Sequence, residues 1–231
     1  MKGIRINIKG KWAHFKRADT NNNPLSHDVI TKTAIIGMIG AITGKDRISM
    51  KQLYPILSQD LKYGVKINND VKKQSCGFTF RSTTNCWDKV PKQIEFLRDV
   101  NYDVIICLTN ERSKDIFETF ASLCEQGKSY YEPVLGLHNC PAEIRYITKG
   151  DIDYAGVREF ETQGFVTDKH IPIDTTNISL RLGFDKIPTF QNDDFWNLPD
   201  KYVPIVYPSK DNFIKVKGEC YIFGNDQWSL I

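Results

Sequence analysis

The 231-residue sequence lacks the signatures of several protein classes. None of its six cysteines forms a C-x-x-C pair, and no two of its four histidines have the spacing of metal ligands. The apolar run at residues 33–43 is far shorter than the roughly 20 residues of a membrane-spanning helix. This run lies well inside the chain, so it is not a secretory signal. We therefore expect reduced, mostly buried thiols, no metal, no cofactor, no membrane contact and a cytoplasmic location.

Charge is unevenly distributed along the chain, although the net charge is only +3. Residues 1–58 contain ten basic and three acidic residues, and residues 59–148 contain twelve of each. Residues 149–231 contain nine basic and thirteen acidic residues. The basic beginning predicts a surface that binds a polyanion. The acidic end either faces a protein partner or keeps the chain soluble.

Hydrophobic periodicity predicts four strands and two helices in the first 148 residues. The strands are expected at residues 4–9, 61–68, 102–109 and 142–148. The first helix is expected to begin after Ser26 or Asp28, both suitable N-caps, and to end at Gly44. The second is expected over 113–125, with Ser113 as its cap. This order of elements is typical of an α+β, ferredoxin-like (βαββαβ) fold, which RNA-recognition domains also use.

The segment between the second and third strands, residues 69–101, is too long for a hairpin turn. Cys76, Phe78 and Phe80 alternate with polar or small residues, which predicts an inserted β-hairpin that projects from the domain. A short helix is expected after it, at residues 91–100. Long insertions of this kind are usually functional.

Helical periodicity fades after residue 149, and short strand-like runs alternate there with turn residues. We therefore predict a ferredoxin-like RNA-binding domain at 1–149 and a small β-rich C-terminal region at 150–231.

The first predicted helix contains an unusual number of small residues. Ala34, Gly37, Ala41 and Gly44 form one stripe of the helix, and Gly40 adds a third glycine. An interior glycine costs about 1 kcal/mol relative to alanine. Close approach of another backbone offsets that cost. The neighbour is the sheet, a second subunit or a nucleic acid.

Basic and aromatic side chains precede this helix. Lysines, a histidine and an arginine at residues 9–17 are interleaved with Trp12 and Phe15. Lys32 and Thr33 lie in the first helical turn, near unpaired N–H groups that attract anions. Cations of this kind hold phosphates and aromatic rings stack on unpaired bases, although Trp12 and Phe15 could equally belong to the core.

Five stretches of the chain resemble motifs of one protein family. They read "GKWAHFKR" (10–17), "NPLSHD" (23–28), "TAIIGMIGAITG" (33–44), "QIEFLRDVNYDVII" (93–106) and "PVLGLHNCPAEI" (133–144). In this order they resemble the Cas-five family of CRISPR-associated RAMP proteins, which cap the 5′ end of the guide RNA in type I Cascade complexes. The resemblance spans residues 3–148, and the size of the C-terminal region is similar to that of type I-B members.

The resemblance implies a subunit of a ribonucleoprotein in antiviral defence that anchors the 5′ handle of the crRNA. Its partners would be the Cascade backbone subunit, the large subunit and, through the assembled complex, target DNA. The inserted hairpin would be a thumb that bends over the guide and touches the adjacent backbone subunit. The candidate RNA-binding residues are Lys9, Lys11, His14, Phe15, Lys16, Arg17, Asn23, Ser26, His27, Lys32, Thr33, Gly37, Gly40, Lys72, Lys73, Phe78, Phe80, Arg81 and Arg145.

The alternative is a metal-independent endoribonuclease, as in type I-C members. His14, His27 and His138, with nearby lysines, could supply acid–base groups for such a reaction. Processing members carry an adjacent Lys-His pair after the third strand, where this sequence reads "NERSKD" (110–115). We therefore expect no catalytic residues. A free-standing protein-interaction module would suit the acidic end but leave the basic beginning unexplained.

Overall fold

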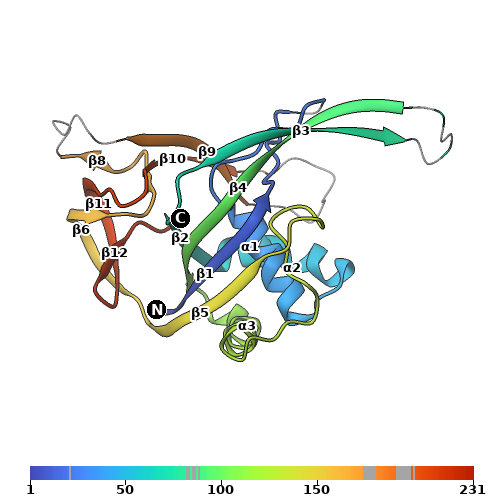
Figure 1. Cartoon of the computed structure of the whole chain (residues 1–231). Coiled ribbons are helices and arrows are strands. Elements are labelled where there is room, and N and C mark those ends of the chain that lie inside the picture. Colours follow the sequence, from blue (N-terminus) through green and yellow to red (C-terminus); the bar gives the residue numbers. More distant parts are fainter. Residues whose placement is uncertain are drawn as a thin grey trace.

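The computed structural model describes residues 1–20, 22–81, 84, 87, 89–173, 181–190, 199 and 201–231. At its centre is an antiparallel sheet with strand order β2-β4-β1-β5, and β3 pairs with the outer half of β4 (Figure 1). The strands of this sheet are β1 (Lys2–Ala13), β2 (Leu61–Ile67), β3 (Lys72–Arg81), β4 (Lys89–Leu108) and β5 (Glu143–Asp151). The four predicted strands are confirmed as β1, β2, the second half of β4, and β5.

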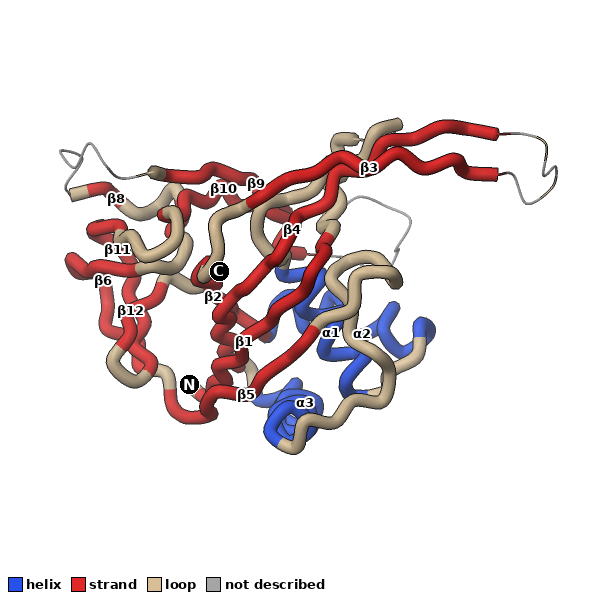
Figure 2. Tube along the Cα trace, viewed as in Figure 1, coloured by secondary structure: helices blue, strands red, loops and turns tan. Residues whose placement is uncertain are grey.

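Three helices lie together on one side of the sheet (Figures 1 and 2). They are α1 (Lys32–Thr43), α2 (Arg47–Asp60) and α3 (Lys114–Glu125), the last preceded by the 3-10 turn η1 (Glu111–Ser113). Ile4, Ile6 and Ile8 of β1 are at most 1% exposed and belong to the same core cluster as Ile35 and Ile39 of α1. These alternating isoleucines therefore face the helices, as the period of two predicts.

The capping bonds of two helices differ from the prediction. Thr31 is the N-cap of α1, because its Oγ1 accepts from the backbone N–H of Ala34 at 3.2 Å. Ser113 precedes α3 but makes no side-chain cap, since its Oγ donates to Asp60 Oδ2 at 2.6 Å. The predicted end of α1 is confirmed, because Gly44 has a left-handed φ of 73°.

Helix α2 was not predicted from the sequence. Its N-cap is Asp46, whose Oδ1 accepts from the N–H of Ser49 at 2.8 Å. Met50 and Leu57 point into the core at helical spacing. Pro55 lies within the helix, where it removes one backbone donor and weakens the helical signal of the sequence.

The predicted helix at 91–100 is wrong. Residues 89–108 form one long strand, whose outer half pairs with β3 in register from Lys72–Arg98 to Arg81–Lys89. Ile94, Leu97 and Val100 are buried at intervals of three within this strand, and that spacing imitates a helix. The predicted projecting hairpin is present as β3 and outer β4 (Figure 2).

The C-terminal region consists of short antiparallel strands, as predicted. The strands are β6 (Asp153–Thr162), β7 (Val166–Thr167), β8 (Ile171–Pro172), β9 (Leu182–Phe190), β10 (Lys201–Pro208), β11 (Ile214–Phe223) and β12 (Asp226–Trp228). They form one sheet in the order β7-β10-β9 and another in the order β12-β11-β6, with β8 beside β11.

This region shares a core with the first part of the chain. Ile187 and Ile205 belong to the main core cluster, and Trp228 packs with Ile105 of β4. The last residue, Ile231, exchanges backbone hydrogen bonds of 3.0 Å with Tyr63 of β2. The boundary at residue 149 stays a prediction, but the packing is continuous across it.

Candidate nucleic-acid interface

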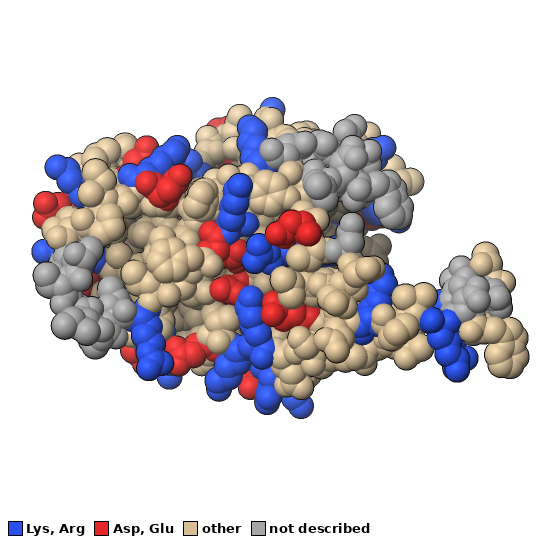
Figure 3. Space-filling view, turned by 90° about the horizontal axis from the view of Figure 1, so that it is seen from above, with Lys and Arg blue, Asp and Glu red and all other residues tan. Residues whose placement is uncertain are grey.

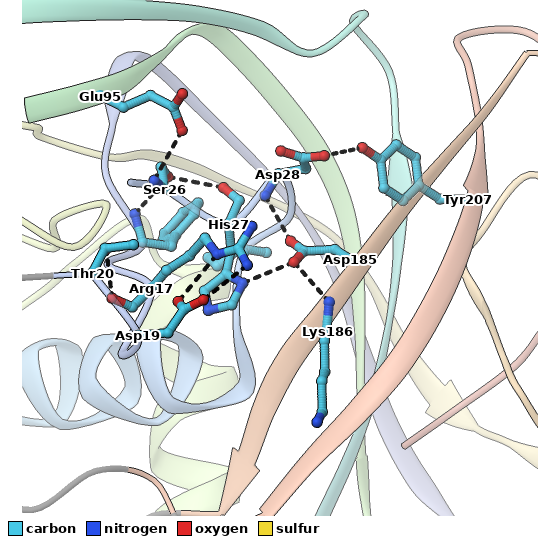
Figure 4. Close-up of polar contacts among 12 residues, drawn as sticks. Arg17, Asp19, Thr20, Ser26, His27, Asp28, Glu95, Asp185, Lys186 and Tyr207 are labelled. Carbon is cyan, nitrogen blue, oxygen red and sulfur yellow. Dashed lines mark hydrogen bonds and ion pairs between the residues drawn. The ribbon is translucent and has the colours of Figure 1, made fainter. Parts of the chain in front are cut away.

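The loop between β1 and α1, residues 14–31, folds back on itself. The N–H of His27 donates to the carbonyl of Phe15 at 2.8 Å, and the N–H of Phe15 donates to Ser26 Oγ at 3.0 Å. The Ser26 hydroxyl then donates to the carbonyl of His27 at 2.8 Å, and Glu95 Oε1 of β4 accepts from the N–H of Ser26 at 3.1 Å (Figure 4). The fully buried Ser26 side chain therefore replaces backbone partners inside the loop.

Two carboxylates attach this loop to the C-terminal strands (Figure 4). Asp185 of β9 lies 3.0 Å from His27 Nδ1 and accepts from the N–H of Asp28 at 2.8 Å. Asp28 in turn accepts from the Tyr207 hydroxyl at 2.5 Å and pairs with Lys73 Nζ at 2.7 Å. Burial alone would raise the pKa of Asp185, but the hydrogen bond and charge of His27 outweigh it and hold that pKa below its usual value.

A first cleft of about 720 Å³ opens beside this loop. It brings together six of the predicted residues, namely His14, Phe15, Lys16, His27, Thr33 and Gly37. Its other lining residues include Lys45 between α1 and α2, Arg47 at the start of α2, and the aromatic residues Tyr54, Tyr131 and Tyr202. Cations beside aromatic rings suit a single-stranded nucleic acid, because they offer both phosphate contacts and stacking surfaces.

Several predicted RNA-binding residues are engaged inside the protein. His14 is 4% exposed, and its Nδ1 donates to the carbonyl of Glu95 at 2.7 Å. Burial lowers the pKa of His14, so its ring is neutral at pH 7 and carries no charge for a phosphate. Phe15 is buried in the core, and Lys73 is shared between Asp28 and Glu95. These residues shape the cleft by holding the loop.

The glycines of α1 face helix α2. A Cβ at Gly40 would lie 2.4 Å from Met50 Sδ, and one at Gly37 would lie 2.7 Å from the Tyr54 hydroxyl. The close neighbour of the small stripe is therefore a helix that the sequence analysis missed. Gly40 is buried beneath Met50, whereas Gly37 also lines the first cleft.

The predicted cations near the N-terminus do not form one surface. Lys16 lines the first cleft, whereas Lys9 and Lys11 are exposed on β1 and line neither large cleft. Figure 3 shows basic and acidic side chains intermixed over the face that it presents. Arg17 pairs with Asp19 at 3.2 Å.

Three further predicted residues lie at the surface or face another cleft. Arg145 is exposed on β5, and Asn23 is exposed with its side-chain oxygen accepting from the N–H of Gln93 at 3.3 Å. Lys32 is buried at the start of α1 and lines a second cleft, away from Lys16.

The hairpin carries the remaining predicted residues on an exposed ribbon. Lys72, Phe78, Phe80 and Arg81 are all exposed, with Phe80 at 47%. Lys92 lies over the Phe80 ring at 5.9 Å from its centroid. Large exposed aromatic side chains at the surface of a narrow ribbon are suited to contact a partner.

Lys45 and Arg47 are cleft residues that sequence reasoning missed. The left-handed Gly44 and the capping Asp46 together mark a helix-to-helix turn, and basic residues flank that turn. Recognising Asp46 as an N-cap would have placed both cations at the end of α1, beside the small stripe.

The described part of the chain contains no group of three or more histidine, cysteine or acidic side chains that could hold a metal ion. Cys107, Cys124, Cys140 and Cys220 are buried, as expected, whereas Cys76 is partly exposed. Burial raises the pKa of Cys107 to about 11 and that of Cys124 to about 12, so these thiols stay protonated. Cys86 lies outside the described residues. Among the described residues, no helix is both long and apolar enough for a membrane span.

Comparison with known proteins identifies the family. No curated protein matches the chain. A solved structure described as a CRISPR protein from Archaeoglobus fulgidus is similar in fold, with a TM-score of 0.63 and 13% identity, covering 99% of this chain and 98% of the other. A chain of a CRISPR RNA-guided surveillance complex has a TM-score of 0.52 and 14% identity, covering 93% of this chain and 91% of the other. The sequence model described as CRISPR-associated protein (Cas_Cas5) matches residues 3–194. The chain therefore belongs to this family of CRISPR-associated proteins.

Proposed function

We propose that this protein is the subunit of a type I CRISPR Cascade complex that binds and caps the 5′ handle of the crRNA. The observation that carries the proposal is the first cleft. Lys16, Lys45 and Arg47 line it together with three tyrosines, beside a loop that is hydrogen-bonded to Glu95 of β4 and Asp185 of β9. Membership of the family supports the assignment of this cleft to guide RNA.

The chemistry of the cleft favours a phosphate backbone with unpaired bases. Lys16 and Lys45 are exposed, and in the described part of the chain no carboxylate pairs with either of them. Their charges are therefore available to phosphates. The rings of Tyr131 and Tyr202 offer surfaces on which bases stack at about 1–3 kcal/mol each.

The test is binding of a crRNA that carries the 5′ handle, measured over a range of salt concentrations. Each lost phosphate contact on a single strand makes the log–log salt slope about 0.7 less steep. Lys16→Ala combined with Lys45→Ala should therefore weaken binding and flatten the slope by about 1.4. Lys215→Ala is the matched control, because Lys215 is exposed on β11 and lines neither large cleft. An unchanged slope in the double variant would remove this cleft from the RNA site.

We also propose that the central sheet belongs to a ferredoxin-like, RAMP domain. Support comes from the strand order β2-β4-β1-β5 with antiparallel neighbours throughout. Helices connect β1 to β2 and β4 to β5, which is the split βαβ connection. On this proposal the β3–β4 hairpin is an insertion between the second and third strands of the domain.

We propose that the protein does not cleave RNA. Cleavage by a 2′-hydroxyl needs a base, an acid and a cation at one phosphate. The Nδ1 atoms of His14 and His27 already bond to Glu95 and Asp185, and His27 Nε2 is buried without a hydrogen-bond partner among the described residues. Incubation with a CRISPR repeat RNA, with and without magnesium, should leave the RNA intact. A discrete cut that His27→Ala abolishes would place the protein among the processing nucleases instead.

A further inference from the structure

The second cleft, also about 720 Å³, lies between the first turn of α1, the start of β2, and strands β7, β8, β10 and β11. Five lysines line it, namely Lys32, Lys62, Lys169, Lys201 and Lys217. Two acidic residues, Asp168 and Glu219, also line it and are exposed. Tyr202 lines both clefts, but the proposed handle-binding role uses none of these five lysines.

Lys32 is the informative residue of the second cleft. Its side chain is in the first turn of α1 and the residue is only 6% exposed, yet nothing in the described part of the chain pairs with its ammonium group. A buried cation normally has a counter-charge, because removing it from water is costly. Burial and the charges of Lys62 and Lys201 together lower the pKa of Lys32 to about 8.

The neighbouring lysines leave this charge uncompensated. Lys62 Nζ donates to the hydroxyl of Tyr221 at 2.6 Å and lies over the same ring. Lys201 Nζ lies 5.1 Å from the ring centroid of Phe190. Both side chains are thus held against aromatic rings, and among the described residues no carboxylate forms an ion pair with either. Lys32, Lys62 and Lys201 thus line the second cleft together with the positive N-terminal end of α1.

The wall of the second cleft is already formed. His170 Nε2 donates to the carbonyl of Glu219 at 3.1 Å, and its Nδ1 lies 3.0 Å from the Thr167 hydroxyl. Gly218 permits this packing, since a Cβ there would lie 2.3 Å from the His170 ring. Both ring nitrogens of His170 are therefore engaged within the protein, and the ring serves to support the wall of the cleft.

We propose that the second cleft binds a phosphate group of a nucleotide-sized ligand. Lys32, Lys62 and Lys201 would contact the phosphate, and Phe190 would pack against the rest of the ligand. The volume of the cleft falls in the range of small-molecule sites. The ligand is either a free nucleotide or one phosphate of a nucleic-acid backbone, since both present the same anion.

The experiment compares the original protein with Lys32→Met, which keeps an unbranched side chain one atom shorter and removes the charge. The probes are inorganic pyrophosphate, adenosine triphosphate without divalent metal, and a short single-stranded RNA, all at matched ionic strength. Calorimetric titration should give at least a tenfold weaker affinity for the anions in Lys32→Met, whereas Lys215→Met should bind as the original protein does.

A stability measurement separates this result from misfolding. Without ligand, Lys32→Met should melt at a higher temperature than the original protein, because an uncompensated buried charge has been removed. Loss of nucleotide binding with unchanged RNA binding would identify a free nucleotide as the ligand. Loss of both would identify a backbone phosphate. Equal anion affinity in the original protein and Lys32→Met, or no anion binding by the original protein, would overturn the proposal. The handle-binding test depends on Lys16 and Lys45, so the two proposals fail independently.

Discussion

Replacing Asp185 with alanine tests the attachment of the C-terminal strands to the loop of the first cleft. The carboxylate is 4% exposed and satisfies the ring of His27 and the N–H of Asp28. Breaking one partner of a buried pair typically costs 3–5 kcal/mol, because the remaining groups stay buried without partners. We therefore expect Asp185→Ala to lower the free energy of unfolding by about 4 kcal/mol.

Asp185→Asn is the matched variant. Its side-chain oxygen can still accept from the N–H of Asp28. Its amide N–H can donate to His27 Nδ1 when that nitrogen carries no proton. We therefore expect a loss of only about 1 kcal/mol, since both buried groups keep a hydrogen bond.

Urea unfolding followed by far-ultraviolet circular dichroism measures both variants, and amide exchange at Asp28 reports the local contact. The folded pKa of Asp185 lies below its unfolded value, so the carboxylate stabilises the protein above about pH 4 and loses this effect as the pH falls through the folded pKa. The difference between the original protein and Asp185→Ala should shrink over that range. If the free energy of unfolding of Asp185→Ala lies within about 1 kcal/mol of that of the original protein at pH 7, the buried contact does not hold the loop.

Three further changes have defined outcomes. Gly136→Ala should lower the free energy of unfolding in urea by more than about 3 kcal/mol, because residue 136 has a φ of 91° and a Cβ would lie 1.9 Å from the carbonyl oxygen of His14. Gly77→Ala, where a Cβ would meet open space, should lower it by less than about 1 kcal/mol, and equal losses would contradict this reasoning. The free energy of unfolding of the original protein, relative to that of Lys32→Met, should rise by about 3 kcal/mol between pH 8 and 10.5, because Lys32 loses its proton at a lower pH in the folded state than in the unfolded state. A difference that does not change with pH would show that Lys32 is not buried as a cation. Phe78→Ser with Phe80→Ser should leave the melting temperature within a few degrees but prevent co-purification with the Cascade backbone subunit, and retained assembly would exclude the hairpin from that contact.

The sequence determined the features that depend on near neighbours in the chain. Alternation in β1 predicted its buried face, and Gly44 predicted the end of α1, because strand periodicity and the left-handed cap are local properties. The alternating aromatic residues of β3 predicted the projecting hairpin. Family motifs were visible for the same reason, since each is a short continuous stretch.

Local sequence patterns led to a wrong prediction at β4 and to the omission of α2. Ile94, Leu97 and Val100 of β4 are buried at intervals of three, so a strand carries the spacing of a helix. Pro55 within α2 conceals a helix that tertiary contacts stabilise against α1.

Only the tertiary structure decided which charged and polar side chains are available to a ligand. His27 and Asp185 are 158 residues apart in sequence, and no pattern near either residue predicts their contact. The fold separates Lys16 from Lys32 and places them in two clefts, although both belong to the same basic segment. Burial, hydrogen bonding and the nearness of other charges arise from packing between distant segments. A residue's type therefore indicates what it can bind, and its tertiary neighbours decide whether it is free to do so.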